Sequence, residues 1–171
     1  MVGAGTLRAE RLTLGLDDTS AEMQPLGIIV SSAAENLPID HLVSLRDQNV
    51  LLLSGREPRG ASYAGIEALF VPTLPSGYLD LSGALKLLKE ERDIEVLLVE
   101  GGPSLNHALF SRGLVDELFL TLAPKLLGGT LDETSAILEG QEGEMLPSGL
   151  RLLSVFAADD ELFLRYSVAE R

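Results

Sequence analysis

The sequence contains no cysteine and only two histidines, His41 and His107, which stand far apart in the chain. Without cysteine, no disulfide, thiolate nucleophile or cysteine metal site can form. The two histidines also lack the spacing of zinc ligands, so we expect no metal site. No serine–histidine–aspartate arrangement is recognisable, and the residues alone therefore identify no catalytic group.

Basic residues are scarce, because 13 Lys and Arg face 26 Asp and Glu, which leaves a net charge of −13. Nucleic acids and anionic membrane surfaces require a basic footprint, so we expect neither as a partner. No apolar run reaches the roughly 18 residues of a membrane-spanning helix, and residues 1–20 lack the pattern of a signal peptide. We therefore expect a cytoplasmic protein. An anionic ligand would need local donors, such as helix N-termini or single arginines.

The composition, with 46% hydrophobic and 23% charged residues in 171, is typical of one globular domain over residues 1–171. Short apolar runs at Gly27–Ser31, Val50–Ser54, 66–71 and 95–100 predict parallel strands that are buried on both faces.

Helices are expected between these runs. Leu81, Leu85 and Leu88 have helical spacing and predict a helix over Leu81–Arg92, and residues 38–47 predict a shorter one.

The pattern changes after residue 115. Residues 116–124, 150–156 and Glu161–Val168 predict strands, and Asp159-Asp160 predicts a tight turn between the last two. Residues 128–148 predict a long surface loop. The sequence therefore predicts an α/β fold with a mostly parallel central sheet, flanking helices and an antiparallel C-terminal hairpin.

The most informative motif is Glu100-Gly101-Gly102-Pro103-Ser104-Leu105. Its two glycines permit a close backbone approach, and Pro103 suits a first helical turn. A helix over residues 104–112 would direct free N–H groups and its positive dipole end outward, as a pyrophosphate site requires. A plain strand-to-helix turn, with glycines needed only for geometry, fits the motif equally well.

A second motif, Gly3-Ala4-Gly5-Thr6, resembles a dinucleotide fingerprint only superficially, because Arg8 stands at the third glycine position. Thr6 could cap a helix or offer its hydroxyl to a ligand. Ser32 and Arg56 follow two predicted strands, at the carboxyl edge where open α/β sheets bind ligands. Turn-forming serines and a solvated arginine are an equally good interpretation.

Taken together, VGAGTLRAE near the N-terminus, LLVEGGPSLNHALFSRGLVDELFLTLAPKLLGG and the C-terminal ELFLRY resemble the reductase domain of riboflavin biosynthesis. This is the bifunctional deaminase-reductase C-terminal, or pyrimidine reductase, family. The resemblance covers nearly the whole chain and is most specific over residues 100–129. It implies a dihydrofolate-reductase-like fold and NADPH-dependent reduction of 5-amino-6-(5-phosphoribosylamino)uracil to the ribitylamino compound, with hydride transfer to the sugar C1′.

The resemblance also implies site residues. Leu12 and Glu100 fall at substrate positions, and the Gly101–Gly102 bond is expected to be cis. The expected cofactor-binding residues are Thr6, Glu10, Ser32, Gly101, Gly102, Pro103, Ser104, Leu105, Asn106, His107 and Ala108. The NADPH 2′-phosphate needs a local counter-charge in so acidic a chain, and Arg56 is our candidate, with Arg8 and Arg59 as alternatives.

The chain departs from the family pattern at three places. Glu10-Arg11 stands where the family commonly has two acids and a proline, and Gly15 replaces a substrate-binding arginine. No deaminase zinc motif is present, so only the reductase half applies. Met1 to Thr6 resembles the end of a buried strand entering a turn, and we expect a further strand and helix to precede it.

Other functions stay open at this point. One is a related oxidoreductase that acts on another pterin or pyrimidine, and another is a non-catalytic nucleotide-binding remnant. Residues 115–124 predict a long apolar edge strand, which a second copy could cover, so we expect a homodimer.

Overall fold

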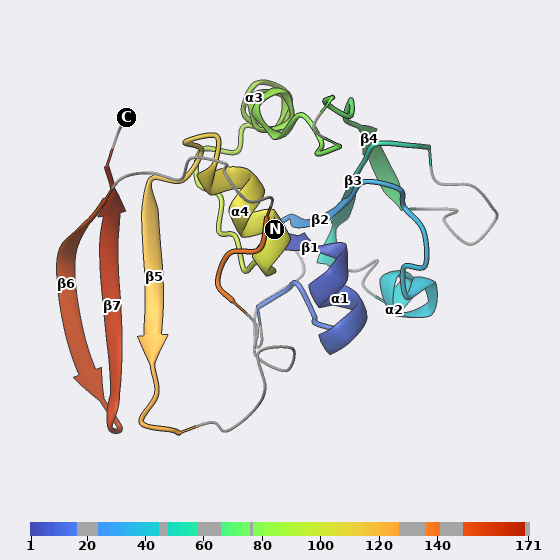
Figure 1. Cartoon of the computed structure of the whole chain (residues 1–171). Helices are drawn as coiled ribbons and strands as arrows, with labels where there is room; N and C mark the ends of the chain where they lie inside the picture. The colour runs from blue at the N-terminus through green and yellow to red at the C-terminus, as the bar shows by residue number, and fades with distance from the viewer. Residues whose placement is uncertain are drawn as a thin grey trace. The chain divides into compact units, whose positions relative to one another are not determined.

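The computed structural model describes residues 1–16, 24–44, 48–57, 66–75, 77–126, 136–140 and 149–169 (Figure 1). The chain divides into two compact units, Met1–Leu105 and Asn106–Arg171. The sequence predicts that residues 1–171 form a single reductase domain, and this stays a prediction. Arg59 and most of the predicted loop over residues 128–148 lie outside the described residues, as do residues 45–47 of a predicted helix.

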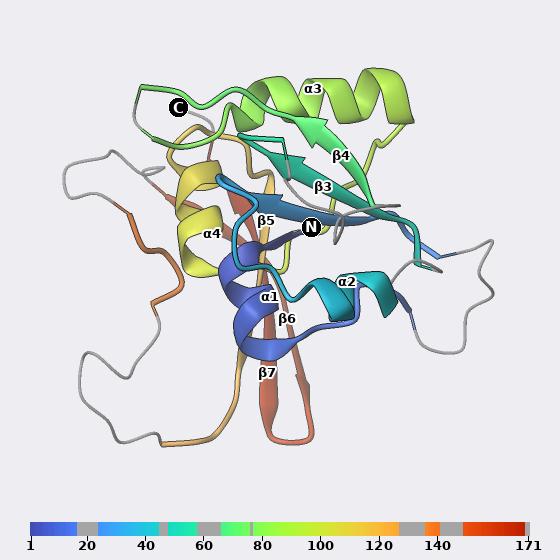
Figure 2. The same cartoon turned by 90° about the vertical axis from the view of Figure 1, so that its right-hand side faces the viewer.

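The first unit is built on a four-stranded parallel sheet with the order β1-β2-β3-β4. Figures 1 and 2 show α1 and α2 on one side of this sheet and α3 on the other. This arrangement confirms the predicted parallel α/β architecture. The elements are β1 (Val2–Gly3), α1 (Ala4–Glu10), β2 (Gly27–Ser31), α2 (Ile39–Ser44), β3 (Val50–Ser54), β4 (Glu67–Phe70) and α3 (Leu81–Arg92).

Alternating side chains of the central strands form a core on each face of the sheet. Ile29 and Leu52 are fully buried in one cluster with Leu7 of α1 and Leu42 of α2. Ile28, Leu51 and Leu53 point to the opposite face and are also buried, as is the inner side of α3. Each such side chain contributes about 1.5–3 kcal/mol on burial. These apolar runs therefore form the parallel strands that their sequence predicts.

Helix α3 has clear signals at both ends. The carboxylate of Asp80 accepts a hydrogen bond from the N–H of Gly83 at 3.0 Å, which is a typical N-cap contact. At the other end Asp93 adopts a left-handed conformation with φ 55°, and its N–H donates to the carbonyl of Leu88. The predicted bounds of this helix are confirmed.

The strand predicted over residues 95–100 is wrong, because residues 93–100 belong to no helix or strand. The segment still lies beside β1, since the Met1 amino group donates to the Leu98 carbonyl at 2.7 Å and Glu100 N–H donates to the Met1 carbonyl at 2.9 Å. The next bond runs from Gly3 N–H to the Gly101 carbonyl at 2.7 Å, one residue beyond the position that a regular parallel ladder would use. The two-residue β1 is thus too short to hold a regular partner strand.

The second unit contains a separate three-stranded antiparallel sheet with the order β5-β7-β6, formed by β5 (Glu117–Leu122), β6 (Leu150–Ala158) and β7 (Glu161–Val168). Asp159 and Asp160 form the turn of the β6–β7 hairpin with φ values of 49° and 66°, as a type I′ turn requires. The predicted C-terminal hairpin is confirmed. Within the described residues this sheet pairs with no strand of the first one. Helix α4 (Pro103–Phe110) spans the boundary between the units.

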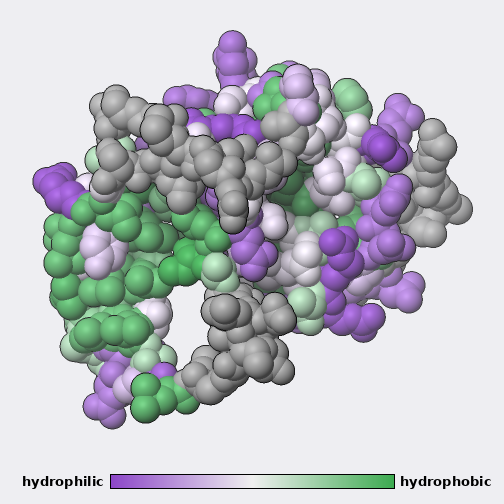
Figure 3. Space-filling view, in the orientation of Figure 1, coloured by the Kyte–Doolittle hydropathy of each residue, from purple (hydrophilic) through white to green (hydrophobic). Residues whose placement is uncertain are grey.

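The two faces of the antiparallel sheet differ in chemistry. Residues paired across antiparallel strands point to the same face. One face is mixed and carries Arg165, which pairs with Glu117 at 2.6 Å and lies over the ring of Phe119 at 5.6 Å. The other, here called the apolar face, consists of Leu118, Leu120, Leu122, Leu150, Leu152, Val155, Ala157, Leu162, Leu164, Tyr166 and Val168. Figure 3 shows apolar side chains gathered over this sheet.

No helix among the described residues is long and apolar enough to cross a membrane.

Candidate functional site

The two glycine motifs of the sequence meet in the first unit. The N–H of Gly3 donates to the carbonyl of Gly101, and a Cβ built on Gly3 would lie 3.5 Å from the backbone nitrogen of Gly102. A Cβ built on Gly102 would collide with the hydroxyl oxygen of Thr6. The bond between Gly101 and Gly102 is cis, as the family resemblance implies. We call Gly3, Thr6, Gly101 and Gly102 the glycine junction.

Thr6 does not cap a helix. Helix α1 begins at Ala4, its N-cap residue is Gly3, and no side chain bonds this cap. The capping alternative is therefore wrong, because Thr6 is already the third residue of the helix. Its hydroxyl instead lies against Gly102.

Helix α4 starts directly after the junction, at Pro103. Backbone N–H groups in the first turn of a helix have no intrahelical acceptor and carry the positive end of the dipole. Ser104 is exposed there, whereas Leu105 and Ala108 are buried. A ligand at this helix start would meet mainly backbone groups and Ser104.

The side chains of Asn106 and His107 are engaged in the second unit. The Asn106 amide donates to the Ile137 carbonyl at 3.1 Å. His107 is buried, and Gly140 packs so closely against its imidazole that a Cβ at Gly140 would overlap the ring. Any cofactor contact from these two positions would therefore come from the backbone, and it stays a prediction.

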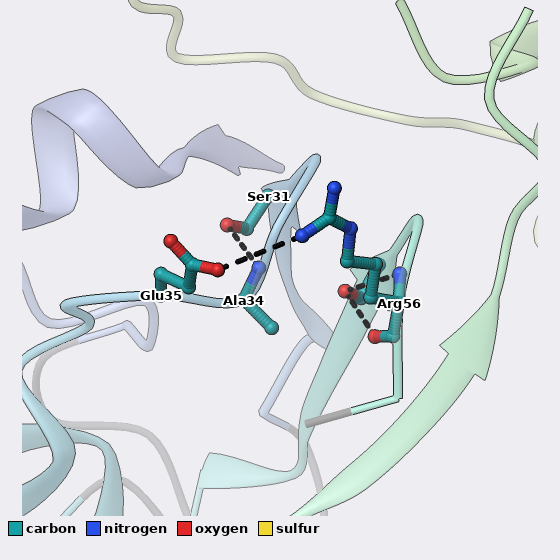
Figure 4. Close-up of polar contacts among 5 residues, drawn as sticks. Ser31, Ala34, Glu35 and Arg56 are labelled. Carbon is teal, nitrogen blue, oxygen red and sulfur yellow. Dashed lines mark hydrogen bonds and ion pairs between the residues drawn. The ribbon is translucent and has the colours of Figure 1, made fainter. Parts of the chain in front are cut away.

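The loops that follow β2 and β3 interlock. The Ser31 hydroxyl accepts a hydrogen bond from Ala34 N–H at 3.1 Å, and the Ser54 hydroxyl donates to the Arg56 carbonyl at 2.6 Å (Figure 4). A Cβ at Gly55 would lie 2.6 Å from the carbonyl oxygen of Ser32, so the loops touch there. The structure thus brings the loops of Ser32 and Arg56, both predicted from strand ends, to one place.

Arg56 has an acidic partner that the sequence did not reveal. Its Nη1 lies 3.7 Å from Oε1 of Glu35, and Figure 4 shows the two side chains pointing toward each other. Nη1 of Arg8 also donates to the Glu35 carbonyl, at 3.4 Å. Two of the three arginines proposed for the phosphate therefore converge on Glu35.

The segment around Leu12 is held by polar side chains. Leu12 packs partly against the core, and Nε2 of His41 lies 2.6 Å from its carbonyl oxygen. The amide oxygen of Gln48 accepts from Leu14 N–H at 3.2 Å. A Cβ at Gly15 would lie 2.6 Å from the amide oxygen of Gln24, so this position has no room for the arginine of the family pattern unless Gln24 moves.

The two predicted acidic site residues are less closely tied to the rest. Glu10 ends α1 and is exposed, and Glu100 is exposed at the start of the junction. Burial lowers the pKa of the Met1 amino group, and the nearby Glu100 carboxylate partly offsets this effect. Among the described residues, no hydrogen bond or ion pair joins either side chain to another predicted site residue, and no group of three or more His, Asp or Glu could hold a metal.

Sequence reasoning missed Glu35, His41, Gln24 and Gln48. Each of these residues contacts a backbone group or a side chain that lies 8 to 34 positions away in the sequence. Only Glu35 left a signal, as a charged residue shortly after a predicted strand end.

Comparison with known proteins supports the resemblance. The family described as the RibD C-terminal domain matches residues 1–164. The 2,5-diamino-6-ribosylamino-4(3H)-pyrimidinone 5′-phosphate reductase of Methanothermobacter thermautotrophicus is 26% identical over 172 residues, which cover 98% of this chain and 78% of that protein. The reductase of the same name from Aquifex aeolicus is 29% identical over 177 residues, covering 100% and 76%.

Among solved structures, Acinetobacter baumannii RibD matches with a TM-score of 0.74 at 24% identity. The match covers 98% of this chain and 46% of that one, so the chain spans less than half of this RibD. This likeness confirms the dihydrofolate-reductase-like fold. Because the family match extends over residues 1–164, the chain belongs to the RibD C-terminal domain family.

Proposed function

We propose that this chain is an NADPH-dependent reductase of riboflavin biosynthesis that acts on a 6-(5-phosphoribosylamino)pyrimidine. Membership of the family and the names of two full-length relatives support a reductase of this pathway. The observation that carries the proposal is the glycine junction, where bare backbone and the Thr6 hydroxyl lie directly before the start of α4.

The residues present fit a dinucleotide. At Gly102 a side chain would overlap Thr6, so the backbone here stays bare and a pyrophosphate can approach closely. The N–H groups of Ser104 and Leu105 would bind the pyrophosphate, and Thr6, Glu10, Ser32 and Arg56 would contact other parts of the dinucleotide. When bound, NADPH supplies the hydride for the substrate's sugar C1′.

The chain itself contributes binding and orientation rather than a nucleophile. The core beneath the junction, with Leu7 and Val2 fully buried, keeps its backbone in place. Leu12 and Glu100 are our proposed substrate contacts, one apolar and one a hydrogen-bond acceptor.

Two substrates of this class merit direct comparison. The family resemblance implied 5-amino-6-(5-phosphoribosylamino)uracil, whereas the reductases of M. thermautotrophicus and A. aeolicus are named for the 2,5-diamino-pyrimidinone compound. The two differ at C2 of the ring, which carries a carbonyl in one and an amino group in the other. A carboxylate accepts hydrogen bonds from an amino group and repels a carbonyl, so a contact from Glu100 to C2 would favour the diamino compound.

The test is a turnover assay with each substrate and NADPH, followed by mass spectrometry of the product. We expect NADPH consumption and a product that has gained two hydrogen atoms. NADPH binding without turnover of either pyrimidine would favour the nucleotide-binding remnant. Turnover only of another pterin or pyrimidine would favour the related oxidoreductase.

We further propose a homodimer that buries the apolar face of the antiparallel sheet. In the single chain Leu122, Leu150, Leu152, Val155 and Leu162 of this face are between 37% and 57% exposed. A contiguous apolar sheet face of this kind is uncommon on monomers and typical of an interface. The predicted edge strand around residues 115–124 supplies only part of it, because β6 and β7 carry most of the exposed residues.

A further inference from the structure

The loop after β2 presents Glu35 in an unusual way. Ala34 and Asn36, on either side of it, both have positive φ values, 52° and 53°. Left-handed backbone is uncommon for alanine, and it persists where the surroundings hold it. Here the Ser31 hydroxyl bonds Ala34 N–H, and the carbonyl of Ser32 packs against Gly55. The loop therefore holds Glu35 at the carboxyl edge of the sheet.

Two cations converge on this residue from different elements. Arg56 approaches its carboxylate from the loop after β3 (Figure 4). Arg8 bonds its carbonyl from α1. In a chain with a net charge of −13, two guanidinium groups at one place form a local site for an anion. The Glu35 carboxylate already neutralises part of that charge.

A carboxylate beside these arginines treats the two nicotinamide dinucleotides differently. It competes with the 2′-phosphate of NADPH for Arg56 and repels it. It can accept a hydrogen bond from the 2′-hydroxyl of NADH, which carries no charge at that position.

We propose that Glu35 sets the cofactor selectivity of this chain, by opposing the 2′-phosphate at Arg56 and Arg8, so that NADH is accepted alongside NADPH. This inference rests on the proposed dinucleotide function. It assigns the adenosine end of the dinucleotide to the interlocked loops after β2 and β3. The glycine junction would hold the pyrophosphate.

The experiment measures the dissociation constants of NADPH and NADH by fluorescence titration, for the unmodified chain and for Glu35→Gln, Arg56→Ala and the double variant. Glu35→Gln should tighten NADPH about two- to fivefold, the size of an exposed ion-pair effect, and should leave NADH unchanged or weaker. Arg56→Ala should weaken NADPH more than NADH and should reduce the effect of Glu35→Gln, because competition for Arg56 is lost while direct repulsion of the phosphate remains. Melting temperatures confirm that each variant is folded.

Glu57→Gln is the matched control, because it removes the same charge from an exposed residue adjacent to Arg56. An equal gain in NADPH affinity for Glu57→Gln and Glu35→Gln would overturn the inference, since the cause would then be net charge. If Glu35→Gln leaves the ratio of the NADPH and NADH dissociation constants unchanged, the inference about Glu35 is overturned, whereas the proposed function is not. If the unmodified chain binds neither dinucleotide, the proposed function fails and the inference fails with it.

Discussion

Single glycines decide how closely the two motifs of the candidate site can approach each other. Gly102 lies against the Thr6 hydroxyl with no room for a methyl group, whereas Gly5, from the other motif, has no atom within 4 Å of a built Cβ. The two positions look alike in the sequence and differ only in their surroundings. They form a matched pair for testing the junction.

Gly102→Ala should reduce NADPH affinity, because the new Cβ collides with the Thr6 hydroxyl and displaces the backbone that would hold the pyrophosphate. Overpacking of this kind costs about 1–3 kcal/mol. If that cost falls on the NADPH-bound state, the affinity for NADPH decreases roughly 5- to 150-fold. Gly102→Val should abolish binding and leave the fold largely intact. Fluorescence titration with NADPH measures the effect, and circular dichroism confirms folding.

Gly5→Ala is the control for this prediction and should leave NADPH affinity within experimental error of the original chain. Combining Gly102→Ala with Thr6→Ala removes the colliding hydroxyl. The melting temperature of the double variant should therefore be close to that of Thr6→Ala alone. Unchanged cofactor affinity in both Gly102 variants would contradict the assignment of the junction to NADPH.

At the scale of elements, an ion pair joins β4 to the last turn of α3. Nη1 of Arg92 donates to Oε2 of Glu67 at 3.1 Å, and Nη2 of Arg92 donates to Oε1. The Arg92 hydrogen bonds lower the pKa of Glu67 below its usual value. A carboxyl group with a lowered pKa in the folded state stabilises that state above its unfolded pKa, and this contribution disappears as the pH falls through the folded pKa.

Glu67→Gln should therefore lower the melting temperature at pH 7, and the difference from the original chain should be smaller at about pH 3, because protonation of the Glu67 carboxyl group removes this contribution. The expected change is small because the pair is exposed and screened by salt. Thermal unfolding at both pH values, at low ionic strength, measures it. Glu95→Gln, an exposed residue beyond the end of α3, is the control, and an equal change in both variants would contradict the role of the pair.

At the scale of the whole molecule, each unit has its own sheet, and the sheets differ in exposure. The strands β2 and β3 are covered on both faces, while β6 is exposed along nearly its whole length. An uncovered apolar sheet tends to associate with a partner, and closed two-fold dimers are the commonest solution. The second unit thus carries the main argument for self-association.

Light scattering at micromolar concentration should give twice the chain mass of 18.3 kDa. Leu152→Asp places a charge on the apolar face, at a half-exposed position of the edge strand β6, and should shift the protein toward the monomer. Ser154→Asp adds the same charge on the opposite face of the same strand and should leave the dimer intact. A clean monomer mass for the unmodified chain would contradict the proposed dimer.

Local pattern was sufficient for most elements. The bounds of β2, β3, α3 and β7 agree with those read from apolar runs and helical spacing, because each element carries its own period and end signals. The prediction failed at residues 95–100, whose central four residues are all apolar, like the first four residues of β3. A strand needs a partner of matching length, and β1 offers only two residues.

The parallel α/β class, the C-terminal hairpin and the glycine turn before α4 could be predicted from the sequence, since these features depend on residues close together in the chain. No local pattern predicts that Gly102 lies against Thr6 or that Arg8 and Arg56 converge on Glu35. The physical reason is that such contacts depend on which loops meet at the carboxyl edge of the sheet. That meeting is set by strand order and by backbone conformations, such as the left-handed Ala34, which no local pattern encodes.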